Sequence, residues 1–307
     1  MPPPTARGAA LFLLISSAAF AFSGPLARAA RPVHPLVIAF GRVALAALIL
    51  GVLNAGAIRR TLPTLSTRQR AIVLGAGSLL AAHFALFLWG LDRTSLPAAL
   101  SLVALEPLSI VLWAWALFRI RPSRPEQLGL LLATLGALLV GRGGDAGEHH
   151  LEGDLLVLGA VILYGAYLAA ARGIRDALPA HTYAAVVYGS AAFALALVLP
   201  FAPGALATAS PLPAHGAVYI ILLALIPTLL GHTAVQWASR HMPPTLVALV
   251  SPGETLGGIA LGIVWFGTIP TLTESLGGLL ILSGTLVALF RSSPPATPAG
   301  EPLSSTP

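Results

Sequence analysis

The sequence predicts an all-α membrane protein with ten transmembrane helices, arranged as two inverted-topology repeats of five helices. Three observations support this fold class. Hydrophobic residues make up 56% of the chain and charged residues only 9%, against roughly a quarter charged in soluble domains. The apolar residues form continuous runs rather than alternating patterns, which favours helices over transmembrane strands. Finally, one short sequence pattern occurs twice.

The predicted spans follow from length. A helix needs about 20 apolar residues to cross roughly 30 Å of hydrocarbon. Most of the candidate segments end at proline, glycine or arginine, which stop helices or remain at the membrane surface. The ten segments are residues 8–27, 33–53, 70–91, 96–118, 126–141, 154–172, 180–200, 215–239, 244–266 and 272–290.

These spans predict four parts of the chain. Residues 1–141 form the first repeat, 142–153 an outward-facing linker, 154–290 the second repeat, and 291–307 a disordered cytoplasmic tail. Because each half has an odd number of spans, the second half must enter the membrane inverted relative to the first.

Arginine distribution predicts the orientation. All 17 basic residues are arginine, and a cytoplasmic N-terminus places 12 of them in cytoplasmic segments and four outside. The positive-inside rule therefore predicts cytoplasmic termini. Arg7, the following apolar run and Ala27-Arg28-Ala29 also resemble a cleavable signal peptide. We expect this segment to be retained, because cleavage would leave nine spans.

The duplicated pattern is Glu-x-Leu-Gly followed by a second glycine. It begins at Glu126 and again at Glu274, an offset of 148 residues, and His83 aligns with His232 at an offset of 149. Pro107 and Pro252 have similar surroundings. We expect the glycines of the pattern, Gly129 and Gly277 among them, to pack helices closely and join the halves.

These repeats resemble a known family. The residues that carry the resemblance are Leu105-Glu106-Pro107, Trp113-Ala114-Trp115, Glu126 to Gly136, Val250-Ser251-Pro252, Glu274 to Gly284, and Pro35 with Arg42. Together they resemble the EamA-type repeat of the drug/metabolite transporter superfamily, closest to bacterial exporters of amino acids, including aromatic ones. The resemblance implies an inner-membrane secondary transporter of small metabolites, working by alternating access through a central cavity. Members often carry a glycine-glutamate pair after the fourth and ninth helices, and Phe118-Arg119 and Phe266-Gly267 stand there instead.

Ionisable side chains inside spans are the candidate functional residues. Each costs about 2.5–3.5 kcal/mol to insert, so it faces the bundle interior or a watery cavity. We predict that substrate is bound by His83, Phe87, Glu106, Tyr164, His232 and Gln236. A hinge or structural role is predicted for Arg42, Pro107, Pro252, Glu254, Gly129 and Gly277.

Each of these assignments has a structural alternative. The histidines can serve as helix–helix hydrogen-bond partners, and the aromatic side chains, with Phe20, Trp113, Trp115 and Tyr167, can simply pack. Either glutamate can pair with Arg42, the only buried cation expected to be available to them. Trp265 is expected in an interfacial belt. Proton coupling through His83 or Glu106 and facilitated diffusion both remain open.

Other function classes have little support. A polytopic enzyme would need a nucleophile, metal constellation or paired acids at one membrane face, and a channel would need a polar stripe. We therefore predict no catalytic residues, no cofactor and no nucleic-acid partner. His149-His150, beside Glu148 and Glu152, suits a metal, but we expect a solvated loop there and no metal site. The expected partners are a small-molecule substrate and the lipid bilayer, with the protein a monomer; other small drugs or metabolites remain the alternative substrates.

Overall fold

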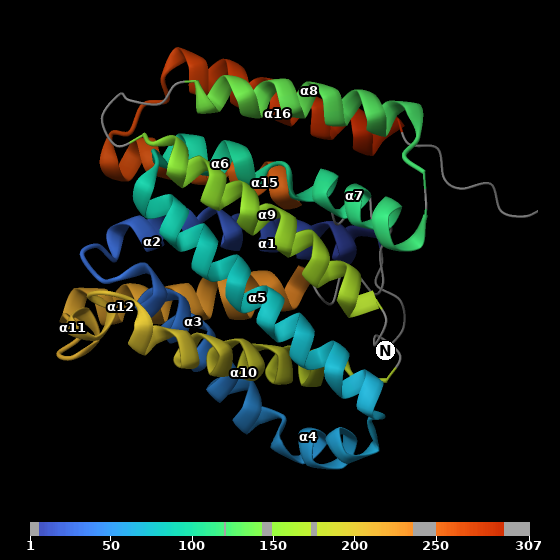
Figure 1. Cartoon of the computed structure of the whole chain (residues 1–307), viewed down its shortest axis with the longest axis vertical. Coiled ribbons are helices and arrows are strands. Elements are labelled where there is room, and N and C mark those ends of the chain that lie inside the picture. Colours follow the sequence, from blue (N-terminus) through green and yellow to red (C-terminus); the bar gives the residue numbers. More distant parts are fainter. Residues whose placement is uncertain (1–5, 120, 143–148, 173–176, 236–249, 292–307) are drawn as a thin grey trace, which may run out of the picture.

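The protein is a bundle of helices lying side by side (Figure 1). The computed structural model describes residues 6–119, 121–142, 149–172, 177–235 and 250–291. Within these ranges all regular structure is helical and no strand occurs, which confirms the all-α prediction. Linker residues 143–148 and the predicted tail beyond Arg291 lie outside the described residues.

The first half contains eight α-helices and one 3₁₀ turn. They are α1 (Ala6–Ala21), α2 (Ser23–Ala29), α3 (Pro35–Leu53), α4 (Ala55–Thr61), η1 (Leu62–Thr64), α5 (Thr67–Arg93), α6 (Leu96–Val103), α7 (Glu106–Phe118) and α8 (Arg124–Gly141). The second half is built from α9 (Leu151–Arg172), α10 (Ala180–Val198), η2 (Leu199–Phe201), α11 (Ala205–Ala209), α12 (Ala214–Leu223), η3 (Ala224–His232), α15 (Val250–Phe266) and α16 (Leu272–Arg291).

Eight helical segments in the described part of the chain are long and apolar enough to cross a membrane. Two of the ten predicted spans are not among them. Polar residues in the first turn of α8, including Arg124 and Glu126, lower its mean hydropathy, and α15 is a shorter apolar helix. A multi-pass membrane fold is therefore supported, whereas a count of ten spans is not.

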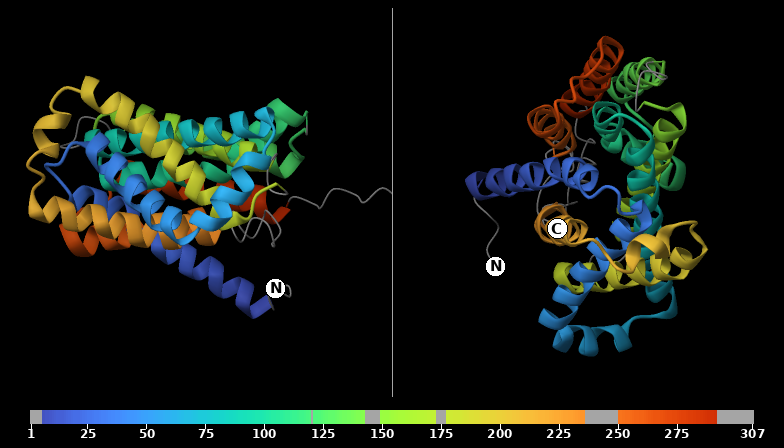
Figure 2. Two further views of the ribbon diagram at one scale, coloured as in Figure 1. Left: turned by 90° about the horizontal axis from the view of Figure 1, so that it is seen from below. Right: turned by 90° about the vertical axis from the view of Figure 1, so that its left-hand side faces the viewer.

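The two halves make matching contacts. The largest contacts between them are α8 with α16, α5 with α9, and α3 with α10. The repeat equivalents of α5 and α9 are η3 and α1, and these two also pack together. Likewise, the equivalents of α7 and α9 are α15 and α1, which pack together as well. The pairs α8–α16 and α3–α10 lie at opposite sides of the bundle (Figures 1 and 2). The contacts therefore follow an approximate two-fold axis relating the repeats.

The duplicated glycines lie where α8 meets α16. A Cβ on Gly129 would lie 2.5 Å from the carbonyl oxygen of Gly284, and one on Gly277 would lie 2.7 Å from that of Gly136. Only glycine permits backbones to approach this closely. Because Gly129 and Gly277 are equivalent in the repeats, these two contacts are exchanged by the same two-fold axis. The order of the contacts also shows that α8 and α16 run antiparallel.

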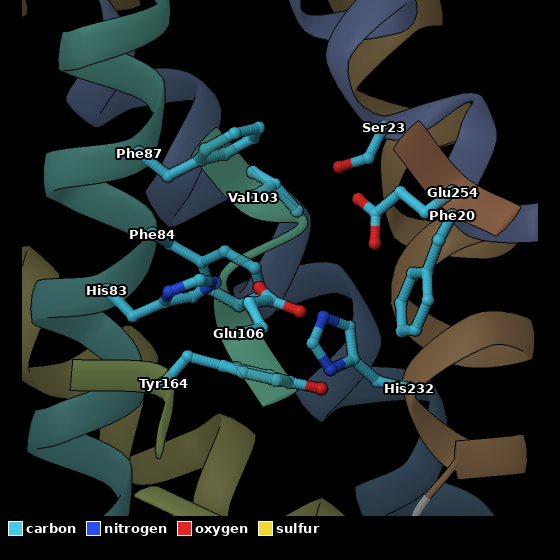
Figure 3. A pocket seen from close by; sticks show the side chains of 10 residues that line it. All are labelled: Phe20, Ser23, His83, Phe84, Phe87, Val103, Glu106, Tyr164, His232 and Glu254. Atoms are coloured by element: carbon cyan, nitrogen blue, oxygen red, sulfur yellow. The ribbon is translucent and has the colours of Figure 1, made fainter. Parts of the chain in front are cut away.

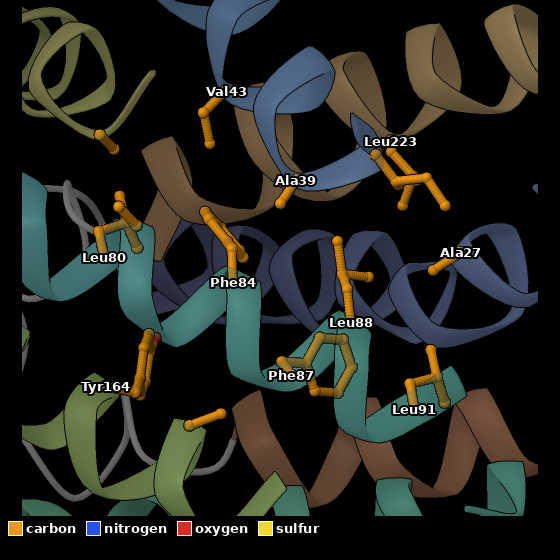
Figure 4. Packing of buried hydrophobic residues seen from close by; sticks show 14 of the residues in the cluster. Ala27, Ala39, Val43, Leu80, Phe84, Phe87, Leu88, Leu91, Tyr164 and Leu223 are labelled. Atoms are coloured by element: carbon orange, nitrogen blue, oxygen red, sulfur yellow. The ribbon is translucent and has the colours of Figure 1, made fainter. Parts of the chain in front are cut away.

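The helix α5 forms the centre of the bundle. Ser66 caps its first turn, its hydroxyl accepting from the backbone N–H of Gln69 at 3.3 Å. Further along, apolar side chains at helical spacing are buried on the side of the helix that packs against α3 and α9 (Figure 4). They are Leu80, Phe84, Phe87, Leu88 and Leu91. This packing positions His83, one residue before Phe84, between α5 and α9.

The start of α1 and the end of α16 lie at the same end of the bundle (Figure 1). The opposite end carries the turn between α5 and α6 and the starts of α9 and α16. We call these the terminal end and the linker end. Predicted orientation places the linker end outside the cell.

Candidate functional site

A narrow cavity lies inside the bundle, where side chains from both halves converge (Figure 3). The cavity leaves room for little more than a water molecule beside the side chains. In this conformation the cavity is too small for a metabolite. Its lining residues are Phe20, Ser23, His83, Phe84, Phe87, Val103, Glu106, Tyr164, His232 and Glu254.

A break in the fourth span helps to form the cavity. The helix α6 ends at Val103 and α7 begins at Glu106, so Pro107 lies in a new first turn instead of inside a continuous helix. Hydroxyls of the second half satisfy backbone carbonyls beside the break. Their donations are Thr255 to Leu100 at 2.9 Å, Ser251 to Val103 at 3.0 Å and Thr285 to Ala104 at 2.9 Å.

Each repeat supplies one carboxylate to the cavity. Glu106 is 8% exposed and Glu254 is 7% exposed, and both point into the cavity (Figure 3). When Pro107 is aligned with Pro252, acid and hydroxyl exchange places, because the first copy reads Glu-Pro-Leu-Ser and the second Ser-Pro-Gly-Glu. Two carboxyl groups in one poorly solvated cavity can hold a proton between them or bind a cationic group.

The histidine His83 is fixed by a backbone contact. Its Nδ1 lies 2.9 Å from the carbonyl oxygen of Ala160 on α9. A carbonyl only accepts, so Nδ1 carries the proton in this contact. The imidazole stacks on Phe87 at a centroid distance of 6.3 Å and lies 5.1 Å from the ring of Tyr164. These contacts hold one edge of the ring towards the cavity.

The repeat mate His232 lies across the cavity from His83 (Figure 3). Three aromatic rings surround it: Phe20 at 4.7 Å, Phe84 at 5.4 Å and Tyr164 at 6.2 Å between centroids. His232 ends η3, a π-helical stretch that contains Pro227. Such stretches interrupt α-helical hydrogen bonding and are frequent at functional sites.

The guanidinium of Arg42 is fully buried behind the cavity wall. Its Nε donates to Thr228 Oγ1 at 3.0 Å, its Nη1 lies 3.4 Å from Ser23 Oγ, and its Cζ lies 4.2 Å above the Phe84 ring. Among the described residues neither glutamate lies within ion-pair distance of Arg42. The alternative of an Arg42–glutamate ion pair is therefore not the arrangement found, and the carboxylates stay available to the cavity.

The structure brings together most of the predicted binding residues. His83, Phe87, Glu106, Tyr164 and His232 all line the cavity, whereas Gln236 lies outside the described residues. Glu254, predicted as a structural residue, also lines it, as does Phe20. Sequence reasoning missed Ser23, Phe84 and Val103 as lining residues. Only Phe84 had a signal in the sequence, because it directly follows His83.

Other candidates lie away from the cavity. Trp113 donates from Nε1 to the carbonyl of Ile162 at 2.8 Å, and Trp115 is 50% exposed. Tyr167 is buried, and Trp265 is 44% exposed near the end of α15. His149, predicted to lie in a solvated loop, is only 2% exposed. That prediction was wrong, because carboxylates of α9 and α16 enclose the ring.

Comparison with known proteins gives the family. A model of the EamA-like transporter family matches residues 7–142 and matches again at residues 151–290. The chain belongs to the EamA-like transporter family. Each EamA repeat therefore contributes one histidine and one carboxylate to the cavity.

One solved structure, described only as the crystal structure of a protein, shares this EamA protein's fold. The TM-score is 0.61 at 19% sequence identity, with 92% of this chain and 97% of that chain covered. No match was found among curated proteins.

Proposed function

We propose that this EamA-family protein is a secondary transporter that exports small metabolites carrying an ammonium group. Amino acids, including aromatic ones, are the first candidates. The observation that carries the proposal is the pair of buried carboxylates, one from each repeat, in a cavity walled by aromatic rings and two histidines.

The side chains match the parts of an amino acid. The ammonium group would lie near Glu106 and Glu254, where a charge-assisted hydrogen bond is available. The carboxylate would accept from the Ser23 hydroxyl or an imidazole N–H. An aromatic side chain would pack against Phe87 and Tyr164 in the edge or stacked arrangements that rings prefer.

The narrow cavity supports alternating access. A metabolite fits only after helices around the cavity separate, so binding and opening are coupled. The α6–α7 break at Pro107 offers a place to bend, and Pro252 lies in the first turn of α15. Bending there would widen the cavity towards one side of the membrane and then the other.

We further propose that the protein resides in the bacterial inner membrane as a monomer with both termini in the cytoplasm. The arginine distribution supports this orientation. A fluorescent protein fused after Pro307, which fluoresces only in the cytoplasm, tests it. Absence of fluorescence with full-length expression would reverse the orientation.

Transport itself is tested in two steps. A thermal-shift screen of purified protein against amino acids and common metabolites identifies a ligand, and counterflow in reconstituted liposomes then measures transport. The proposal expects counterflow that unlabelled ligand saturates. Non-saturating flux would indicate a channel. Saturable transport of organic ions without an amino group would assign the protein to other small drugs or metabolites.

A further inference from the structure

A second buried polar cluster lies at the linker end, away from the cavity. The imidazole of His149 is its centre, with Nε2 2.7 Å from Asp154 Oδ2 and Nδ1 3.5 Å from Glu274 Oε1. The second contact has an ion-pair distance and is not a hydrogen bond, and Nδ1 has no hydrogen-bond partner among the described residues. The three side chains are only 2–3% exposed. Both ring nitrogens of one buried histidine therefore face carboxylate oxygens.

Other groups donate to both carboxylates. The Thr94 hydroxyl donates to Asp154 Oδ1 at 2.7 Å. Glu274 accepts from the Ser95 hydroxyl, and from the backbone N–H of Thr271 at 2.7 Å. These acceptor roles suit ionised carboxylates.

The geometry has a consequence for the proton count of His149. A neutral imidazole has one N–H, so one nitrogen would present its lone pair to a carboxylate. In an imidazolium, Nε2–H donates to Asp154 and the positive charge of the ring attracts Glu274 at 3.5 Å. With the proton bound, the buried cluster carries one net negative charge, and without it two. The placement of the ring between two carboxylates therefore suits a charged imidazolium better than a neutral imidazole.

The cluster connects three parts of the fold that are far apart in sequence. Thr94 and Ser95 form the turn between α5 and α6, His149 and Asp154 lie at the start of α9, and Glu274 lies in the first turn of α16.

Charged neighbours surround the cluster of His149, Asp154 and Glu274. Arg93 pairs with Glu152 at 3.2 Å, and Arg28 donates to the carbonyls of Leu91 and Thr94; Arg142 lies at the end of α8 and His150 beside His149. Within the described residues, no group of three or more potential ligands is arranged for a metal ion.

We propose that His149, Asp154 and Glu274 form a proton-binding site that holds the linker end closed. Proton binding favours the closed form because only that form places both carboxylates against the ring. Loss of the proton leaves two buried carboxylates with no cation between them and favours separation of the start of α16 from α9 and the α5–α6 turn. The inference rests on the proposed alternation between open and closed forms, and it makes opening at this end respond to pH.

The closed-to-open change can be measured without a substrate. The chain has no cysteine, so a pair of introduced cysteines carries spin labels at chosen places only. Leu151 on α9 and Leu272 on α16 are exposed at 55% and 74% and lie at the linker end. Distances between labels on L151C and L272C are measured in liposomes by double electron–electron resonance, from about pH 5.5 to about pH 8.5.

The expected result is a growing long-distance population as pH rises. For one linked proton, the ratio of open to closed forms increases by up to about tenfold per pH unit. His149→Gln should remove this dependence and stay more open throughout, whereas His149→Lys, which keeps a cation, should stay closed throughout. His150→Gln is the matched control, because the neighbouring ring is exposed, and it should respond to pH like the parent.

A second measurement covers the case in which a His149 variant does not fold. Nitrogen NMR of the ¹⁵N-histidine-labelled parent protein reports the protonation of ring nitrogens. We expect one buried imidazolium in the closed form and its loss as the long distance appears. A buried neutral ring in the closed form, or a distance that does not change with pH, would overturn the proposal. Neither result bears on transport through the cavity, which the counterflow experiment tests separately.

Discussion

Glu126 and Glu274 occupy the same place in the two repeats, but their surroundings differ. Each lies in the first turn of its helix and accepts from a backbone N–H of the preceding turn, that of Ser123 at 2.6 Å or of Thr271 at 2.7 Å. Glu126 is half-buried at the terminal end. Glu274 is 3% exposed at the linker end, where it also accepts from Ser95 and faces His149.

The difference separates two kinds of shared residue. The glycines that follow both glutamates make equivalent contacts between α8 and α16, as a common helix pair requires. The glutamates themselves share only the helix cap. A duplicated sequence therefore retains the contacts that build the fold, while the two ends of the bundle acquire different charge environments. The proton site proposed at the linker end has no equivalent at Glu126 within the described residues.

The largest predicted effect concerns the acids that the two repeats place in the cavity. Glu106→Gln and Glu254→Gln should each lower transport of an ammonium-bearing substrate by about 10- to 100-fold, the loss expected for a charged hydrogen bond. Counterflow in liposomes measures it. Glu152→Gln, an exposed acid on α9, is the control and should transport normally. If only one of the two variants lowered transport, the result would contradict a site shared by the two repeats.

A second prediction tests the equivalence of the glycines. Gly129→Leu and Gly277→Leu should each destabilise the protein by about 1–3 kcal/mol, because a side chain at either position meets backbone of the partner helix. Unfolding in detergent at increasing denaturant gives both values. The matched control is Gly75→Leu, since a Cβ there has no neighbour within 4 Å. Clearly unequal losses would break the two-fold relation between α8 and α16.

A third prediction tests the difference between the glutamates. Glu126→Ala should cost about 0.5–1 kcal/mol, as loss of an accessible cap does. Glu274→Ala should cost about 2–3 kcal/mol, because it also leaves buried partners without an acceptor. The same unfolding assay applies. Equal costs would show that the linker-end contacts of Glu274 add nothing to stability.

The smallest predicted effect concerns His34, just before α3. His34 caps α3, its Nδ1 accepting from the Leu36 N–H at 3.2 Å, and burial lowers the pKa of His34 from 6.5 while Asp92 opposes the shift. Because the pKa of His34 is lower in the folded state, its contribution to the free energy of unfolding is complete above the unfolded-state pKa. That contribution is lost as the pH falls below the unfolded-state pKa. His34→Asn keeps a capping side chain but has no titrating group there. Melting curves of this variant should therefore lack the small loss of stability that the parent protein shows at acid pH.

Much of the fold followed from composition and repetition. Long apolar runs predicted helices, and two pairs of duplicated positions, His83 with His232 and Pro107 with Pro252, pointed to the region of the cavity. The reason is physical, because a polar group in a membrane span must face an interior site.

Other features depend on contacts between distant segments. The π-helical stretch around Pro227 is satisfied by side chains such as Thr228, whose hydroxyl donates to the Leu223 carbonyl at 2.8 Å. The burial of His149 depends on Glu274, which lies in another span. Local sequence around His149 is polar and glycine-rich, so it predicted solvent exposure. Nothing in that stretch alone indicates that α16 covers it.

The most direct test of the central claim is a binding comparison on the wild-type protein. Thermal stabilisation by phenylalanine is compared with that by 3-phenylpropionate, which has the same ring and carboxylate but no amino group. We predict concentration-dependent stabilisation by an amino acid of this kind, its loss without the amino group, and its loss in the Glu106→Gln and Glu254→Gln variants. Equal stabilisation by both compounds, unchanged in the two variants, would contradict a cavity in which both repeats bind an ammonium group.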